Sequence, residues 1–359
     1  MTAFIFVCVK ITVHRGSHQI GGSCIEIAAG TTRVILDAGL PLDADATTGP
    51  LTPPVSGLFD QIGPSVDALF LSHSHADHSG LISLSRSQVP VWLTAGTSKM
   101  ILAGGLFARQ PGVSRLRTKL LSPGVPVVVG SVKVTAYPVD HSVFDAMAFL
   151  VEAEGKRLLY TGDLRFHGRK PGMAKQLVRV ASTAPLDALI IEGTRIGDRA
   201  TEKNLSEANL EVQLVEDMHA APGIVLAMYS PLNVDRFVSY YRAAKKTKRT
   251  MVVDPYQAFV LYLIGKQAKL PRPNTASGLR VIVPPRFGFS QAGKKLAHTR
   301  WAATLSGSSI TTAEIRANPE RFVMLFRQSV QPWLYPTGLP QRTTCIFSYW
   351  PGYPSLVRR

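Results

Sequence analysis

The 359-residue sequence has few cysteines and no long apolar run. Its three cysteines, Cys8, Cys24 and Cys345, lie far apart, so they form neither a zinc-binding pair nor a disulfide framework. Such sparse cysteine usage is typical of the reducing cytoplasm, which is the expected location. No apolar run approaches the roughly 18–20 residues of a membrane span, so no membrane partner is expected. The hydrophobic fraction of 45% is still ample for a large core, and the length predicts two packed units or one domain with a long insertion.

Acidic residues are scarce in the second part of the chain. Residues 201–359 hold 21 Lys and Arg against 9 Asp and Glu, a net charge of +12, whereas residues 1–200 hold 19 against 15, a net charge of +4. The densest basic cluster consists of Arg242, Lys245, Lys246, Lys248 and Arg249. One interpretation is a charged surface that keeps the protein in solution. The favoured one is attraction of a polyanion through its phosphates, with nucleic acid as the candidate partner.

Four side chains of metal-ligating type occur within six residues, at His73, His75, Asp77 and His78. They read H-x-H-x-D-H and directly follow the apolar run 66–71, which is typical of a buried strand. In an extended chain residues two apart point the same way, so His73 and His75 can bind one ion together. Asp77 and His78 then point towards a neighbouring position. Imidazole and carboxylate at this density predict zinc, or a similar divalent metal, rather than calcium or magnesium.

This motif resembles the metallo-β-lactamase superfamily, and two later segments extend the resemblance. A strand-like run at 132–137 leads to His141, and another at 156–160 leads to Asp163. The resemblance implies that one zinc is bound by His73, His75 and His141. It implies a second zinc bound by Asp77, His78 and Asp163, with Asp163 bridging the two. It also implies an αββα sandwich, and a water between the metals that becomes hydroxide and attacks the substrate.

The sequence pattern changes near Thr201, from hairpin-like strands to alternating helix and strand. Helical spacing at 205–218 is followed by strand-like 223–229, helical 234–244, strand-like 250–253 and helical 256–266, as in a small parallel α/β unit. This part resembles the β-CASP insertion of the nucleic-acid-processing branch, which includes the ribonuclease J group. We therefore expect a metallo-β-lactamase domain over 1–200 and a β-CASP-like insertion over 201–343. Residues 344–359 are expected to begin a return to the first domain that is truncated.

The β-CASP resemblance suggests further site residues. Glu192, at the end of a strand-like run, matches an acidic position of the family and is expected to act catalytically with Asp77; it can also cap the next turn. Ser230, Asn233 and Arg236 match a strand-to-helix turn whose polar groups can donate to a phosphate, although such residues are also ordinary N-caps. With the basic cluster they form the predicted nucleic-acid-binding set. The glycine loop at 18–24 either lets the backbone approach the metals or forms a plain tight turn.

The C-terminal region departs from the family. β-CASP proteins supply a Ser-Gly-His segment there, whereas this sequence has no histidine after His298. A weaker second zinc site is therefore expected. The favoured function is a zinc-dependent nuclease that cleaves RNA, with single-stranded DNA as a further candidate substrate. A homodimer is one of the oligomeric states that the sequence allows. The alternatives are a metal-bearing nucleic-acid-binding protein with weak or no activity, and a small-molecule hydrolase acting on a lactone or thioester.

Overall fold

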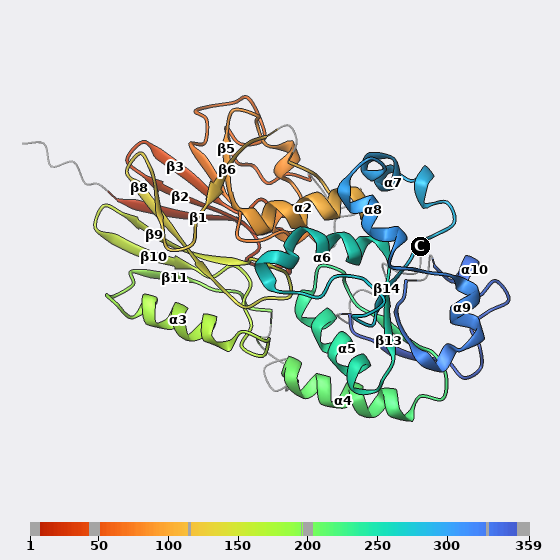
Figure 1. The fold of residues 1–359 in the computed structure, drawn as a ribbon. Coiled ribbons are helices and arrows are strands. Elements are labelled where there is room, and N and C mark those ends of the chain that lie inside the picture. The colour runs from red at the N-terminus through yellow and green to blue at the C-terminus, as the bar shows by residue number, and fades with distance from the viewer. Residues whose placement is uncertain are drawn as a thin grey trace, which may run out of the picture. The chain divides into compact units, whose positions relative to one another are not determined.

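The computed structural model describes residues 8–42, 51–113, 116–194, 196, 204–327 and 330–349. The chain forms two compact units, Met1–Lys203 and Asn204–Arg359 (Figure 1). Within the described ranges, none of the helices combines the length and the apolar character needed to cross a bilayer.

The first unit contains two β-sheets. The six-stranded sheet has the order β1-β2-β3-β4-β5-β6, with β1 (Val9–Arg15), β2 (Cys24–Ala29), β3 (Thr32–Leu36), β4 (Ala68–Phe70), β5 (Pro90–Thr94) and β6 (Arg117–Leu121). The five-stranded sheet has the order β11-β10-β9-β8-β7, with β7 (Pro126–Val129), β8 (Val132–Pro138), β9 (Met147–Ala153), β10 (Lys156–Tyr160) and β11 (Ala188–Ile190). Strands β1 and β11 are therefore edge strands of different sheets.

Alternating side chains divide the core of this unit into layers. Ile27 and Phe70 of the first sheet pack with Val134 and Phe149 of the second, which places one apolar cluster between the sheets. Neighbouring side chains point the other way, and there Ile35, Leu69 and Val91 pack with Ile101 of helix α2 (Ala95–Phe107). Helix α3 (Pro171–Ala181) packs against β8 of the second sheet. This αββα sandwich confirms the predicted fold class.

The second unit is built on a parallel six-stranded sheet of order β15-β14-β13-β16-β12-β17. Its strands are β12 (Val225–Met228), β13 (Thr250–Val253), β14 (Leu279–Ile282), β15 (Ser309–Ile310), β16 (Phe322–Leu325) and β17 (Thr344–Phe347). Its helices are α4 (Glu207–Ala220), α5 (Val234–Lys246), α6 (Pro255–Ala268), α7 (Gln291–Leu296), α8 (Arg300–Ser306), α9 (Thr312–Ala317) and α10 (Gln331–Leu334).

Apolar side chains cover both faces of the second sheet. Residues of α4, α5 and α6 pack on one face, whereas residues of α9 and α10 pack on the other. The longer helices begin at side-chain caps, because Ser206, Asn233 and Asp254 each accept a hydrogen bond from the first turn of α4, α5 and α6.

The strand at the end of the described chain differs from the expectation. The sequence predicted that residues from Thr344 onward return to the first domain. Instead β17 pairs in parallel with β12, from Thr344 opposite Val225 to Phe347 opposite Met228. The sequence pattern shows that a segment is extended, but the choice of partner depends on which edge is free in the folded unit. Residues 350–359 lie outside the described part.

Candidate metal centre

The histidine motif lies where the chain leaves β4. After Phe70 the backbone runs through His73 and His75 and then forms the short helix α1 (Ala76–Ser79), which carries Asp77 and His78. Residues 38–40 hold this helix in place, because the Ala38 amide donates to the His78 carbonyl and the Leu40 amide to the Ala76 carbonyl. The segment after β3 thus fixes the position of the histidine motif through backbone hydrogen bonds.

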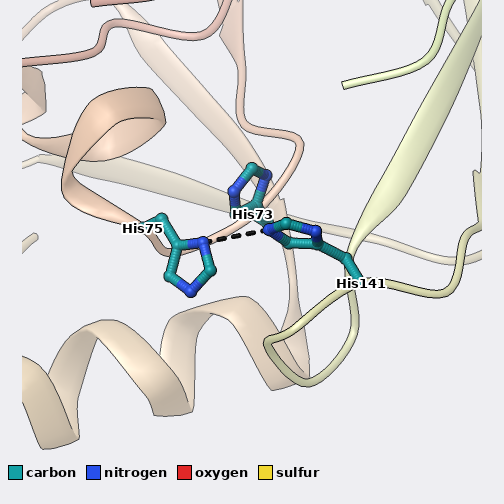
Figure 2. Close-up of side chains that lie close together, drawn as sticks. All are labelled: His73, His75 and His141. Atoms are coloured by element: carbon teal, nitrogen blue, oxygen red, sulfur yellow. Dashed lines mark hydrogen bonds between the residues drawn. The ribbon is translucent and has the colours of Figure 1, made fainter. Parts of the chain in front are cut away.

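Three imidazoles converge at this point, as Figure 2 shows. The rings of His73, His75 and His141 have centroids 4.7–4.9 Å apart, and their ligand atoms lie within 4.8 Å of one another. His141 Nε2 is 3.0 Å from His75 Nδ1. His73 Nε2 is buried and has no hydrogen-bond partner in the described part of the protein. Neutral imidazoles that face one another around an unsatisfied nitrogen fit the donor set of a zinc site.

A second group adjoins the first. His73, Asp77 and His78 also have ligand atoms within 4.8 Å of one another. Asp163 lies between the groups, because one carboxylate oxygen is 3.0 Å from His78 Nε2 and the other is 3.7 Å from His141 Nε2. The structure therefore brings together all six predicted metal-ligating residues, from three distant segments of the chain.

The sequence interpretation missed Asp37, a fully buried carboxylate directly after β3. Asp37 accepts hydrogen bonds from the Ser72 amide and hydroxyl at 2.7 Å and from the Tyr160 hydroxyl at 2.6 Å, and it lies 2.7 Å from His78 Nδ1. The Ser72 hydroxyl is also 3.0 Å from His73 Nδ1. Asp37 thus orients His78 directly and His73 through Ser72, as outer groups around metal ligands commonly do. The only sequence signal was a carboxylate that follows an apolar run.

Burial and neighbouring charges separate the pKa values of these imidazoles. Burial lowers the pKa of His73 and of His141 well below the usual value, and other histidines add to the effect. Burial would also lower the pKa of His78, but the carboxylates of Asp163 and Asp37 outweigh it and raise that pKa well above the usual value. For Asp163 burial opposes ionisation, yet His78 lowers the pKa of this carboxyl. His73 and His141 are therefore neutral imidazoles, the form that binds a metal, whereas His78 must give up a proton before it can act as a ligand.

Two acidic residues, Asp140 and Glu192, stabilise the loops beside the metal-ligating residues. Asp140 pairs with Arg165 at 2.8 Å, and both side chains are almost fully buried. Glu192 accepts hydrogen bonds from the Leu164 amide at 2.9 Å and from the Thr194 hydroxyl at 2.7 Å. Burial raises the pKa of Glu192. Glu192 thus caps the segment after Asp163 and also lines the cavity next to Asp77 and His78.

The glycine loop packs directly against the motif. Gly21 has φ +84°, and a Cβ atom there would lie 2.9 Å from the Asp77 Cβ. A Cβ atom at Gly39 would collide with the Asp77 carbonyl oxygen. Only glycine fits these positions, so both glycines are required by the close approach of backbone to Asp77.

The predicted nucleic-acid-binding residues lie in the second unit, around α5. Asn233 caps α5, Ser230 accepts a hydrogen bond from the Leu232 amide, and Arg236 pairs with Glu207 at 3.2 Å. Two cluster members also have internal partners: Lys246 lies 2.8 Å from Glu211, and Arg249 donates to the carbonyls of Gly223 and Ala221. The side chains of Arg242, Lys245 and Lys248 are exposed, although Arg242 also approaches Glu211.

Known proteins resemble this chain over more than half of its length. A family model described as a beta-lactamase superfamily domain matches residues 32–239. Ribonuclease J of Helicobacter pylori (strain 26695) is 22% identical over 250 residues, which cover 68% of this chain and 36% of that protein. An RNase J-like protein of Methanocaldococcus jannaschii is 27% identical over 226 residues, covering 58% of this chain and 48% of that protein. The transcription termination factor FttA of Methanothermobacter thermautotrophicus is 22% identical over 276 residues, which cover 70% of this chain and 42% of that protein.

The matched regions span between about a third and a half of these relatives. A crystal structure of a protein of unknown function from Enterococcus faecalis V583 superposes with a TM-score of 0.61 and 22% identity. That superposition covers 95% of this chain and 98% of the other, which supports the fold.

Proposed function

The chain belongs to the metallo-β-lactamase superfamily, and from this premise we propose that it is a zinc-dependent nuclease that hydrolyses RNA phosphodiester bonds. The resemblance seen in the histidine motif is confirmed by the family match. Hydrolase chemistry at a divalent metal centre follows from the family and the donor groups. Zinc, RNA as substrate and phosphodiester cleavage are the proposed refinements, supported by the ribonuclease J-like relatives and the basic second unit.

One observation carries the proposal: six metal-ligating side chains from distant parts of the chain meet in one place. We assign His73, His75 and His141 to one zinc, and Asp77, His78 and Asp163 to a second, more weakly bound one. Bound zinc would polarise a phosphoryl oxygen and activate water for attack.

The protein residues around the centre have separate tasks in this proposal. Asp37 and Ser72 hold His78 and His73 in the orientation that binding requires. Asp77 would orient the attacking water through its carboxylate. Glu192, whose pKa is raised by burial, keeps its proton to a higher pH than an exposed carboxyl and is assigned to proton transfer.

The proposal is tested with purified, zinc-loaded protein and 5′-labelled single-stranded RNA, resolved by gel electrophoresis. We expect cleavage that is abolished by a chelator, restored by zinc, and lost in His75→Ala and Asp163→Ala. His298, an exposed histidine of the second unit, provides a matched control, since His298→Ala should cleave as the parent does. RNA that is bound but never cleaved would instead support the nucleic-acid-binding alternative, and turnover of lactones or thioesters alone would support the small-molecule hydrolase.

A further inference from the structure

A cavity of about 650 Å³ in the first unit adjoins the metal-ligating side chains. Asp77, His78, Asp163 and Glu192 line one part of it. The rest lies between the end of β1 with its glycine loop and the segment around β11. The volume is in the range of sites that bind small molecules or parts of larger ones.

Apolar side chains from both edge strands line this cavity. Val13 of β1 and Ile20 of the glycine loop contribute on one side, and Leu189 and Ile191 contribute on the other. All four are exposed to solvent, with Ile191 57% and Leu189 53% accessible. Scattered exposed apolar residues are ordinary, but four that line one cavity beside a reactive centre indicate a surface that a ligand covers.

Charge restricts what that ligand is. Among the described lining residues, Arg15 is the only lysine or arginine, and its guanidinium already donates to the Leu51 carbonyl at 2.7 Å. A chain of phosphates would therefore leave its charges without partners on the apolar side, which is unfavourable. Gln19 and Thr194 offer neutral polar groups beside the apolar ones. The cavity thus suits a flat, uncharged group with a polar edge that is attached to the reacting phosphate.

We propose that this cavity is the subsite for one of the two nucleosides that flank the scissile phosphate. The base lies across Ile20, Leu189 and Ile191. Its polar edge or the ribose can bond to the Gln19 amide and to the Thr194 hydroxyl, which donates to Glu192 and can still accept. This inference rests on the proposed phosphodiesterase function and adds to it that the first unit contacts a base, whereas the basic second unit contacts phosphates.

Calorimetry with adenosine 5′-monophosphate and ribose 5-phosphate tests the subsite on the zinc-loaded full chain. Both probes carry the same phosphate, so the ratio of their affinities isolates the base. The nucleotide should bind about tenfold more tightly, the ratio expected when roughly 60 Å² of apolar surface leaves water. Ile20→Asp and Leu189→Asp should each remove most of this ratio while leaving ribose 5-phosphate binding within about twofold.

Val128→Asp is the matched control, because Val128 is an exposed apolar residue on β7, the opposite edge strand of the sheet that contains β11. The Val128→Asp variant should have the same ratio of nucleotide to ribose 5-phosphate affinity as the parent. Equal affinities for the two probes, no binding of either, or equal loss of the ratio in Val128→Asp would overturn the subsite. Base-dependent binding without RNA cleavage would overturn the proposed nuclease function and leave the subsite standing.

Discussion

The Asp37 carboxylate connects the two groups of metal-ligating side chains. It contacts Ser72, His78 and Tyr160, and through the Ser72 hydroxyl it reaches His73. Its backbone has φ +61°, in the left-handed region that asparagine and aspartate adopt more readily than most residues. Asparagine at this position therefore keeps the shape and the backbone while removing the charge.

The Asp37→Asn variant should bind zinc about 10–100-fold more weakly than the parent. The reason is that the imidazoles of His78 and His73 lose their fixed orientation. Competition against a chromophoric chelator measures the change, and a circular dichroism spectrum like that of the parent checks the fold. Asp67→Asn, which changes a carboxylate bonded to the Arg33 amide, is the control. Unchanged zinc affinity in Asp37→Asn would contradict the orienting role.

Glu26 is expected to make the stability of the first unit sensitive to acid. Burial raises the pKa of this carboxyl, but hydrogen bonds from Arg33 and His14 more than compensate, so its pKa is lowered. The unfolded chain therefore takes up the proton first. The stabilisation is fully present above the unfolded value of about 4.3 and is lost as the pH falls through the lower folded value.

Glu26→Gln should be about 1–2 kcal/mol less stable than the parent at pH 7, and its stability should depend less on pH below pH 5. Urea unfolding at a series of pH values measures both effects. Asp187→Asn, which removes an exposed pair with Lys156, should change stability much less than Glu26→Gln does, because solvent screens exposed ion pairs. If the parent and Glu26→Gln lose stability in parallel on acidification, another group is responsible.

Residues that act together in a contiguous motif could be predicted, and those joined only by folding could not. His73, His75, Asp77 and His78 lie within six residues, so their joint role was readable from the sequence. Asp37, Ser72 and Tyr160 meet across three strands, and neither the positive φ of Asp37 nor its contacts are visible in any local pattern. His141 and Asp163 were placed through the family resemblance, not through their own spacing.

For helix α5, too, the sequence predicted the element but not the residues that its side chains contact. Its existence and its basic C-terminal turn followed from the sequence, but the partners did not. Arg236 was expected to reach a phosphate, yet it pairs with Glu207, which is almost fully buried. Arg249 likewise donates to two backbone carbonyls. The remaining exposed cations, Arg242, Lys245 and Lys248, are therefore the ones best able to bind phosphates.

Charge reversal in Lys245→Glu with Lys248→Glu should weaken RNA binding for all sequences alike, because phosphate contacts position nucleic acid without reading bases. The slope of log affinity against log salt should decrease by about 0.7 for each lost contact with single-stranded RNA. Fluorescence anisotropy at several salt concentrations measures both. Lys175→Glu with Arg179→Glu reverses two exposed charges on α3 and should leave binding unchanged. Equal binding by both double variants would leave the α5 charges with a role in solubility alone.

At the scale of the whole molecule, the proposed metal centre belongs to one unit. Every residue assigned to it lies within Met1–Lys203, and so do the cavity and its lining. Metal binding should therefore stabilise the first unit specifically, since the ligand is held by the folded form of that unit.

Removing the metal should lower the melting temperature of the first unit, and zinc at about 100 times its Kd should restore about 2.7 kcal/mol. Differential scanning calorimetry with chelator, and then with added zinc, measures the shift. The transition of the second unit serves as the internal control and should not move. His141→Ala should reduce the zinc-dependent shift to the smaller one that the weaker second site supplies, and a shift as large as that of the parent would place the tighter metal elsewhere.

Each unit is one continuous stretch of the sequence, so the ribosome completes the first unit before the second. All described strands of the first unit precede residue 204, so both sheets, as far as the structure describes them, are synthesised before the second unit. At 5–20 residues per second, translation of residues 204–359 gives the first unit a lead of roughly 10–30 s. In the second unit β12 is the first strand made, and β17, which covers its outer edge, is made last among the described strands. The emerging chain therefore carries an open β12 edge for most of that interval, and this is where chaperones or aberrant strand pairing would act on the nascent protein.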